Sequence, residues 1–246
     1  MPDVQETLRR LAQRFAARDV MTPQERLETG ADAEEAARKL ENYPDYDVIP
    51  IRQGDRLVAF LERASPKPKV IQIQHVLGAE TSILDLVDSL CDRRFTFVVG
   101  RHEVIGLVSV SDLNDPVVKL PYFVLLEGVE RQLADTLRTV VVDDTIRRLR
   151  IDSERLTRLR SQKERLRQEG VDRDWVTLLY FRELLEAAVD LGKLELSHQE
   201  IEQLAAVRNR IAHATEKELV ESHADVRTLS RVRDVCMNLL LDGSIA

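Results

Sequence analysis

Apolar and polar residues follow the same order twice in the first half of the chain. In the first copy, residues 32–40 have helical spacing, and two runs rich in aliphatic residues, 46–51 and 56–62, lie on either side of a Gln-Gly-Asp turn. Apolar residues spaced three or four positions apart are typical of a helix, and short aliphatic runs around a turn are typical of a β-hairpin. The first copy therefore predicts a helix followed by a hairpin.

The second copy has a helix-like segment, 82–94, followed by two β-like runs, 95–100 and 103–110. Aligning Ala59 with Gly106 gives a repeat of 106 − 59 = 47 residues. Each unit is expected to contain a helix, a hairpin and a short closing helix, with an extra strand ahead of it, KVIQI in the second unit. A unit of this size cannot bury its own sheet, so we expect the two units to pack face to face.

The second half of the chain, after Asp115 and Pro116, shows helical spacing and no convincing strand. Gly and Pro at helix ends and a Ser-x-x-Glu capping box mark the boundaries. Five helices are expected: one opened by Pro121, a basic one from Asp143 or Asp144 to Gly170, one from residue 174 to Gly192, one capped by Ser197 and Glu200, and one over residues 225–241. Such a series predicts an antiparallel helical bundle.

The two patterns together predict an α+β protein with two domains. Residues 1–118 are expected to form a pair of β-α-β-β-α units, at about 15–66 and 67–115, and residues 119–246 an all-α bundle of five helices. With 43% hydrophobic and 32% charged residues, the composition is that of a globular protein. No apolar run is long enough for a membrane span, and the N-terminus does not resemble a signal peptide, so we expect a cytoplasmic protein without a membrane partner.

Cysteine content narrows the chemistry. Cys91 and Cys236 are far apart in the sequence and show no metal-ligand spacing. We therefore expect both to be buried, apolar residues, and we expect neither a disulfide framework nor a metal site.

The charge is unevenly distributed along the chain. The net charge of −7 argues against a broad cationic surface for nucleic acid. Residues 147–167 nevertheless contain nine basic and three acidic side chains. This segment is either a solvated helix face or a strip that follows a phosphate backbone. The candidate RNA contacts in it are Arg158, Lys163 and Arg165.

Three stretches of the first half resemble a tandem pair of CBS domains, the regulatory module named after cystathionine β-synthase. They are DVMTP (19–23), VIPI (48–51) and VIGLVSVSDL (104–113), and the resemblance covers about residues 1–115. The last stretch resembles the family's nucleotide-contacting motif: Gly, two apolar residues, Ser or Thr, one residue, Ser or Thr, Asp. The resemblance implies a regulatory module that binds an adenine nucleotide, which is AMP, ADP or ATP.

The residue types of this motif suit a nucleotide. Gly106 would let the backbone approach a nucleoside, and Ser109 and Ser111 would offer hydroxyls at a strand-to-helix junction, where free N–H groups favour phosphate. Asp112 can accept hydrogen bonds from two ribose hydroxyls. The alternative is that Ser111 or Asp112 only caps the next helix, and both roles can hold at once.

The first unit departs from the motif. The matching places hold Ala59, Glu62, Ala64 and Ser65. A glutamate at the place of the first hydroxyl would repel a phosphate. If the pair binds one nucleotide, we therefore expect the site at the second unit's motif, with Asp112 on the ribose.

The fourth predicted helix of the second half contains RNRIAH, with Arg208, Asn209 and His213. A helical bundle with this sequence resembles the HEPN superfamily, whose helical domains occur in many prokaryotic RNA-cleaving toxins and defence proteins. The family's hallmark is Arg, four to six residues and His, often with Asn directly after the Arg. The resemblance covers about residues 121–241, and the motif lies in the penultimate helix, as the family leads one to expect.

This resemblance implies a metal-independent endoribonuclease at a homodimer interface. His213 would take the proton from a ribose 2′-hydroxyl, and Arg208 would stabilise the charge that develops on the scissile phosphate. Asn209 would orient one or the other, and Arg210 could add a phosphate contact. No cofactor is required for catalysis, because the nucleophile belongs to the substrate.

Two functions from different classes follow. The first is an RNase of a toxin–antitoxin or defence kind, gated by an adenine nucleotide at Asp112. The second is a non-catalytic nucleotide sensor or scaffold, whose bundle only dimerises or binds a partner. In the second, Arg208 pairs with a carboxylate such as Glu183 or Glu186, and His213 caps a helix end.

Overall fold

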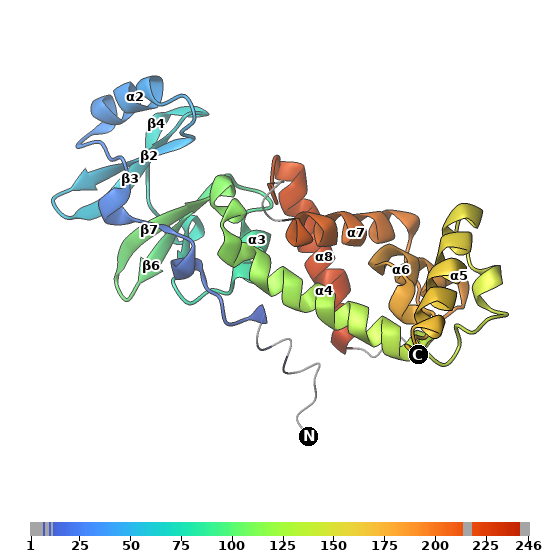
Figure 1. The fold of residues 1–246 in the computed structure, drawn as a ribbon. Coiled ribbons are helices and arrows are strands. Elements are labelled where there is room, and N and C mark those ends of the chain that lie inside the picture. Colours follow the sequence, from blue (N-terminus) through green and yellow to red (C-terminus); the bar gives the residue numbers. More distant parts are fainter. Residues whose placement is uncertain (1–6, 8–9, 11, 214–217, 242–246) are drawn as a thin grey trace. The chain divides into compact units, whose positions relative to one another are not determined.

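The chain forms two compact units, each described here by itself. The computed structural model describes residues 7, 10, 12–213 and 218–241. The first, called the mixed unit, consists of residues 13–121 and 218–230 and holds the β-sheets. The second, called the helical unit, consists of residues 122–213 and 231–241 with the described residues before 13. The protein is thus α+β (Figure 1). None of the described helices combines the length and the apolar character of a membrane span.

The hairpins of the mixed unit repeat at an interval of 47 residues. The strands form two pairs whose boundaries all differ by this interval: β2 (Val48–Gln53), β3 (Arg56–Glu62), β6 (Phe95–Gly100) and β7 (Glu103–Ser109). The register irregularity is repeated too, between Ile51 and Arg52 in β2 and between Val98 and Val99 in β6. The structure therefore confirms the repeat and the hairpins that the apolar pattern predicts.

The strand ahead of each unit pairs with the hairpin of the other unit. β1 (Thr22–Pro23), ahead of the first unit, pairs with β7 of the second, with Pro23 opposite Gly106. β4 (Ser65–Val70), ahead of the second unit, pairs with β3 of the first. The sheet orders are β2-β3-β4 and β1-β7-β6-β5, where β5 (Val76–Gly78) runs parallel to β6. The strand predicted at KVIQI is therefore only partly right, since β4 ends at Val70 and completes the first sheet.

The first hairpin is not followed by the closing helix that the repeat predicts. The chain turns after β3 and continues directly into β4, whose sequence SPKPKV contains two prolines. Proline and the residue before it favour extended backbone, so this segment pairs as a strand instead. The second hairpin does have its closing element, the 3-10 helix η4 (Val110–Asn114).

One apolar cluster joins helix α2 to the first hairpin, and another joins the two sheets. Helix α2 (Ala33–Asn42), whose N-terminus is capped by Asp32, packs Ala36 and Leu40 against the first hairpin. Helix α3 (Ile83–Ser89) ends earlier than predicted. The two sheets contact each other through Phe60 and Phe97, whose ring centroids are 5.4 Å apart. This contact agrees with the expected packing of one 47-residue repeat against the other, inside the mixed unit.

The helical part of the chain contains α4, α5, α6, α7 and α8. Their bounds are α4 (Pro116–Leu137), α5 (Ser153–Gln168), α6 (Phe181–Asp190), α7 (His198–Ala212) and α8 (His223–Leu241). Residues 116–121 of α4 and 223–230 of α8 belong to the mixed unit, and the rest of both helices to the helical unit. The capping box of Ser197 and Glu200 is present as predicted, with the Ser197 N–H 2.8 Å from Glu200 Oε2.

Three predicted helix starts are wrong. Helix α4 begins at Pro116, with the Val117 N–H donating to Asp115 Oδ1 at 2.8 Å, so Pro121 lies inside the helix. Helix α5 begins at Ser153 because the Asp152 carboxylate accepts from two N–H groups of its first turn. Helix α6 begins at Phe181 and not at residue 174. In the first two, a side-chain cap decides the start, which an apolar stripe alone does not reveal.

The two cysteines differ in burial. Cys236 is fully buried in α8, and burial raises the pKa of its thiol to about 12, so the thiol stays protonated. This confirms the expectation of a buried, apolar residue. Cys91 is only half-buried, because it lies in the loop after α3, so the expectation was wrong there.

Arg155 joins α5 to α6. Its guanidinium donates to both carboxylate oxygens of Glu183, at 2.7 and 3.0 Å, and to the Leu178 carbonyl at 3.0 Å. The two side chains of the ion pair are 18% and 14% exposed. We expect Arg155→Ala to lower the free energy of unfolding by about 3 kcal/mol, because it leaves Glu183 unpaired in a poorly solvated place. Urea-induced unfolding measures this loss.

Arg158 provides the matched control on the same helix. It pairs with Glu154 one turn away at 2.8 Å, and both side chains are mostly exposed. Exposed pairs of this kind contribute less than about 0.5 kcal/mol, so Arg158→Ala should leave the unfolding midpoint almost unchanged. Equal losses in the two variants would show that the Arg155–Glu183 pair is not what holds α5.

Candidate functional site

Strand β7 ends at a corner where hydroxyls and a carboxylate meet. The backbone N–H and Oγ of Ser109 both donate to Asp112 Oδ2, at 2.6 and 2.7 Å. Ser109 Oγ also lies 2.8 Å from Ser111 Oγ, and since its own hydrogen goes to Asp112, it accepts from Ser111. The structure thus brings these three predicted residues together. It also gives Asp112 a capping role at the start of η4, while Oδ1 is not used by these bonds.

The fold itself requires glycine at position 106, for a reason that the nucleotide motif does not reveal. Gly106 is buried in β7 opposite β1, and a Cβ atom placed on it would lie 2.7 Å from Met21 Sδ and 2.7 Å from the Thr22 carbonyl oxygen. The close approach of β1 therefore requires a residue without a side chain here. A contact between Gly106 and a nucleoside stays a prediction.

A cavity of about 850 Å³ opens at the matching end of the first hairpin. Glu62 and Ala64 line it at the places that correspond to Ser109 and Ser111, since 62 + 47 = 109 and 64 + 47 = 111. Gly106, Ser109, Ser111 and Asp112 are not among its lining residues. Around it lie three acids (Asp47, Glu62, Asp92), three arginines (Arg63, Arg93, Arg94), two histidines (His75, His223), and Ala64, Gln74 and Phe95.

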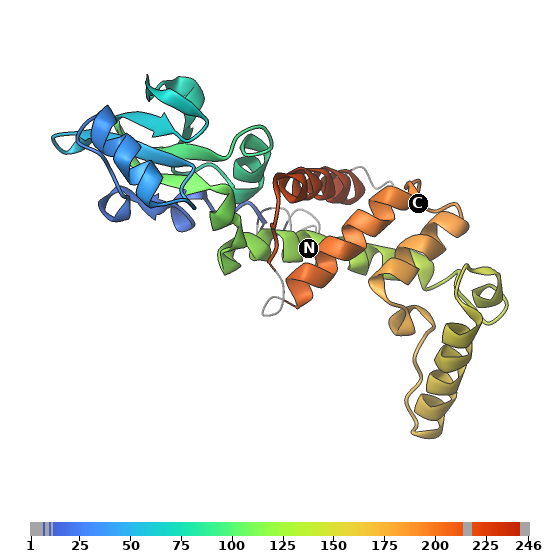
Figure 2. The ribbon, with the colours of Figure 1, turned by 90° about the horizontal axis from the view of Figure 1, so that it is seen from above.

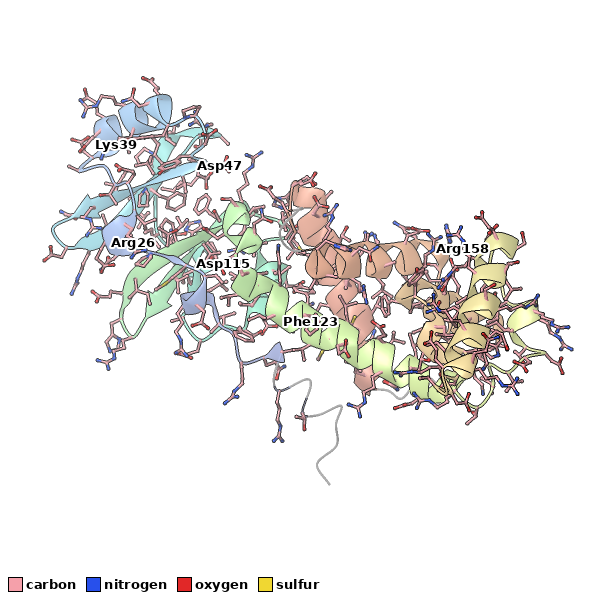
Figure 3. The ribbon with its side chains drawn as sticks, viewed as in Figure 1. Arg26, Lys39, Asp47, Asp115, Phe123 and Arg158 are labelled. Atoms are coloured by element: carbon pink, nitrogen blue, oxygen red, sulfur yellow. The ribbon has the colours of Figure 1, made fainter. Side chains whose placement is uncertain are left out.

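The acidic side chains of this cavity are neutralised or exposed. Glu62 pairs with Lys69 at 2.7 Å, so the expected repulsion of phosphate by this glutamate is offset. Asp47, labelled in Figure 3, pairs with Arg94 at 2.7 Å, and the two occupy equivalent places in the repeat because 47 + 47 = 94. Asp92 is 92% exposed, where solvent screens its charge.

Two arginines of the cavity bond to neutral groups. The Arg63 guanidinium donates to the carbonyl oxygens of Leu40, Tyr43 and Tyr46, at the C-terminal end of α2. Arg93 Nη1 donates to the Gln74 carbonyl at 2.5 Å. Carbonyl acceptors carry no net charge, so both arginines keep a full positive charge beside the cavity. Arg63 and Arg93 are exposed, so solvent screens their charges as it screens that of Asp92. Because neither arginine has a carboxylate partner, the lining has a modest preference for an anion.

The predicted catalytic residues lie at the end of α7. Arg208 is half-buried, whereas Asn209 is exposed and His213 is exposed as the C-cap of α7, with its backbone N–H donating to the Asn209 carbonyl at 3.0 Å. Arg210 is half-buried. The capping position of His213 agrees with the structural alternative, and its exposure leaves the imidazole accessible to a substrate.

Arg208 has a carboxylate neighbour, although not one that the sequence pointed to. Arg208 Nη2 lies 3.7 Å from Glu130 Oε2 of α4, while the expected partners Glu183 and Glu186 pair with Arg155 and Arg182. Burial raises the pKa of the Glu130 carboxyl, and the charge of Arg208 offsets part of that effect. The two residues border a hollow of about 60 Å³ beside Phe123, which is too small to hold a nucleotide.

Most of the basic segment forms α5, the yellow helix in Figure 2, and Leu159 is the residue that this helix buries completely. Arg158, labelled in Figure 3, is exposed and pairs with Glu154, and Arg165 is exposed. Lys163 Nζ lies 4.5 Å from the centroid of the Trp175 ring. Lys163 is thus engaged in a cation–π contact within the unit, which reduces its availability to RNA. Arg158 and Arg165 stay predicted phosphate contacts.

Sequence reasoning missed four residues that border these sites. The 47-residue repeat could have pointed to both arginines. Arg63 follows Glu62, which corresponds to Ser109 of the nucleotide motif, and Arg93 lies just before the second hairpin. No local pattern points to Glu130 or His223, because each reaches its site from a distant part of the chain. Within the described residues, no group of three or more His, Cys, Asp or Glu side chains could hold a metal ion.

No known protein-family model matches the chain, and no curated protein matches its sequence. Among solved structures it is similar to the CBS domain of a bacterial CNNM/CorC family Mg²⁺ transporter in complex with ATP (18% identity, TM-score 0.33, 46% of this chain and 94% of that one). The same kind of domain with a novel inhibitor matches at 16% identity and TM-score 0.33, over 48% of this chain and 82% of that one. Hypoxic Response Protein I with two coordinated zinc ions matches at 21% identity and a TM-score of 0.32, over 40% of this chain and 96% of that one.

Proposed function

We propose that the protein is a nucleotide-sensing regulatory protein and that its mixed unit is a tandem CBS-type module. The observation that carries the proposal is the cavity of about 850 Å³ with the uncompensated charges of Arg63 and Arg93. This volume lies in the range of small-molecule sites, and guanidinium groups bind phosphate oxygens well. Phe95 adds an aromatic side chain to the lining, against which a base can pack. An adenine nucleotide satisfies all three features.

The proposal includes two nucleotide positions related by the repeat. The first position is the cavity. The second position is the corner at the end of β7, where Asp112 accepts the ribose hydroxyls. There the hydroxyls of Ser109 and Ser111, which donate to Asp112 and to Ser109 in the free protein, turn to donate to phosphate when the nucleotide binds. Gly106 lies three residues ahead of Ser109 in the same strand, close to β1. The hydrogen bonds among the three polar side chains support this assignment, because they already point the hydroxyls and the carboxylate to one corner.

Calorimetric titration of the full chain with ATP and with AMP tests the proposal. We expect two molecules to bind per chain. Arg93→Ala should weaken one of the two positions about tenfold, because an arginine–phosphate hydrogen bond contributes about 1.5 kcal/mol. The control is Arg56→Ala, an exposed arginine at the start of β3 that does not line the cavity. If neither nucleotide binds at millimolar concentration, the proposal fails.

A second candidate function is metal-independent RNA cleavage by two helical units in a homodimer. The observation that favours it is the accessibility of Arg208, Asn209 and His213 at one end of α7. In the proposed step, His213 removes the proton of a ribose 2′-hydroxyl, and the oxygen attacks the adjacent phosphorus to form a 2′,3′-cyclic phosphate. The bond to the 5′-oxygen breaks, and that oxygen takes a proton from water and leaves as a hydroxyl. Arg208 stabilises the negative charge on the phosphate and Asn209 orients the reacting groups. Nucleotide binding to the mixed unit would gate this activity.

A further inference from the structure

A segment from the C-terminal part of the sequence belongs to the mixed unit. The Asn114 side chain, which follows β7, donates to the Val220 carbonyl and accepts from the Val220 N–H, both at 2.9 Å. Ser230 Oγ donates to Asp88 Oδ1 at 2.6 Å at the other end of the segment. Leu219 and Val220 are buried. Residues 218–230, called here the docking segment, are thus held on the mixed unit at both ends.

The docking segment contributes a side chain to the cavity. His223, the first residue of α8, lines it, and its Nε2 lies 2.7 Å from the Cys91 carbonyl oxygen. A carbonyl oxygen only accepts, so Nε2 carries the hydrogen and Nδ1 is the ring nitrogen that Cys91 does not engage. Arg227 Nε also donates to the Cys91 carbonyl, at 3.3 Å. Two side chains of α8 therefore hold the loop that leads to Arg93 and Arg94.

The same helix continues into the helical unit. Helix α8 runs without interruption from His223 to Leu241, and its residues from 231 onward belong to the helical unit. There it supplies buried apolar side chains, Val232, Cys236 and Leu239. The first turn of α8 is thus at a ligand cavity, and its later turns are in the core of the other unit.

We propose that His223 contacts the ligand in the cavity and that ligand binding there stabilises the docking segment on the mixed unit. This inference rests on the proposed nucleotide-sensing function and concerns the regulation of its first position. Coupling between two binding events is reciprocal, so a docked segment raises ligand affinity by the same factor by which ligand stabilises docking. Ligand binding in the cavity would then stabilise the first turn of α8, a helix whose later residues belong to the helical unit.

The test measures affinity and backbone protection in one variant background. Asp112→Ala is used throughout, so that only the cavity binds ATP. Hydrogen–deuterium exchange should show that ATP slows exchange of the amides in residues 218–230. Adding His223→Ala should lower ATP affinity about fivefold, through the lost hydrogen bond that Nδ1 accepts from a ribose hydroxyl or the amino group of ATP, and abolish the ATP-dependent protection. His102→Ala is the control, since His102 is exposed in the β6–β7 turn and does not line the cavity.

A second variant tests the coupling without touching the cavity. Asn114 does not line it, so Asn114→Ala should lower ATP affinity only by loosening the docking segment, by about threefold. Circular dichroism confirms that each variant is folded, and Ser230→Ala replaces Asn114→Ala if that variant unfolds. Failure of ATP to bind any variant, including the unmodified protein, overturns the nucleotide function. If ATP binds equally well with and without His223 and exchange in 218–230 is unchanged, the inference is wrong while the nucleotide function stands.

Discussion

Replacing Asp112 with alanine is expected to reduce the number of ATP molecules bound per chain from two to one. The variant removes both carboxylate oxygens from the corner, and with them the proposed acceptors for the two ribose hydroxyls. Hydrogen bonds to an ionised acceptor contribute about 1.5 kcal/mol or more each, so the second position should weaken at least about 100-fold. Isothermal titration with ATP measures the loss as one vanished binding step.

The capping role of Asp112 makes a second variant necessary. Asp112→Asn retains an oxygen that can accept from Ser109 but loses the charge, so the fold is preserved and ATP binding at the corner should weaken about tenfold. Ser65→Ala is the matched control, because Ser65 holds the same place in the first unit, 112 − 47 = 65. Two unweakened binding steps in Asp112→Ala would assign this carboxylate to capping alone.

Replacing His213 with alanine is expected to abolish RNA cleavage. A general base contributes about 10²- to 10⁴-fold to the rate, and no other histidine is described near the end of α7. The unmodified protein is incubated with structured RNA in EDTA, with and without ATP, and cleavage products are followed on a gel. His198→Ala is the control, because His198 is exposed at the opposite end of the same helix.

Replacing Glu130 is expected to raise the rate of RNA cleavage, whereas replacing His213 is expected to lower it. In the proposed cleavage the Glu130 carboxylate would compete with the RNA phosphate for the Arg208 guanidinium, since Arg208 and Glu130 form a long, partly exposed pair. Such pairs contribute at most about 1 kcal/mol, so Glu130→Gln should increase cleavage up to about fivefold. If the unmodified protein cleaves no RNA under any nucleotide, the helical unit is a scaffold, and the nucleotide function of the mixed unit is unaffected.

Several elements follow from local sequence because the physics that forms them is local. The β2–β3 and β6–β7 hairpins are set by short aliphatic runs around turn residues, and their repeat can be counted in the sequence. The capping box at Ser197 and the stops at Gly170 and Gly192, both with positive φ, depend on neighbours within a few positions. The starts of α4, α5 and α6 were misplaced because an apolar stripe does not reveal where a helix first becomes hydrogen-bonded.

The candidate sites also divide into features set by neighbouring residues and features set by residues far apart in the chain. The arrangement at the end of β7 follows from local sequence. Ser109, Ser111 and Asp112 lie within four consecutive residues, and one turn brings them together. The partner of Arg208 could not be predicted, because Glu130 is on another helix 78 positions earlier, 208 − 130 = 78. The cavity likewise depends on Arg63, Arg93 and His223, which no common motif contains.

The amino-acid sequence by itself determined the repeat, the two hairpins, the helical second half, and the cluster of hydroxyls and carboxylate after β7, because each depends on residues close together in the chain. Only the tertiary structure decided which hairpin each leading strand joins, where an anion-favouring cavity opens, and that the first turn of α8 belongs to it. These features arise from contacts between segments tens to more than a hundred residues apart. Their free energy depends on how surfaces fit together, which local periodicity does not encode.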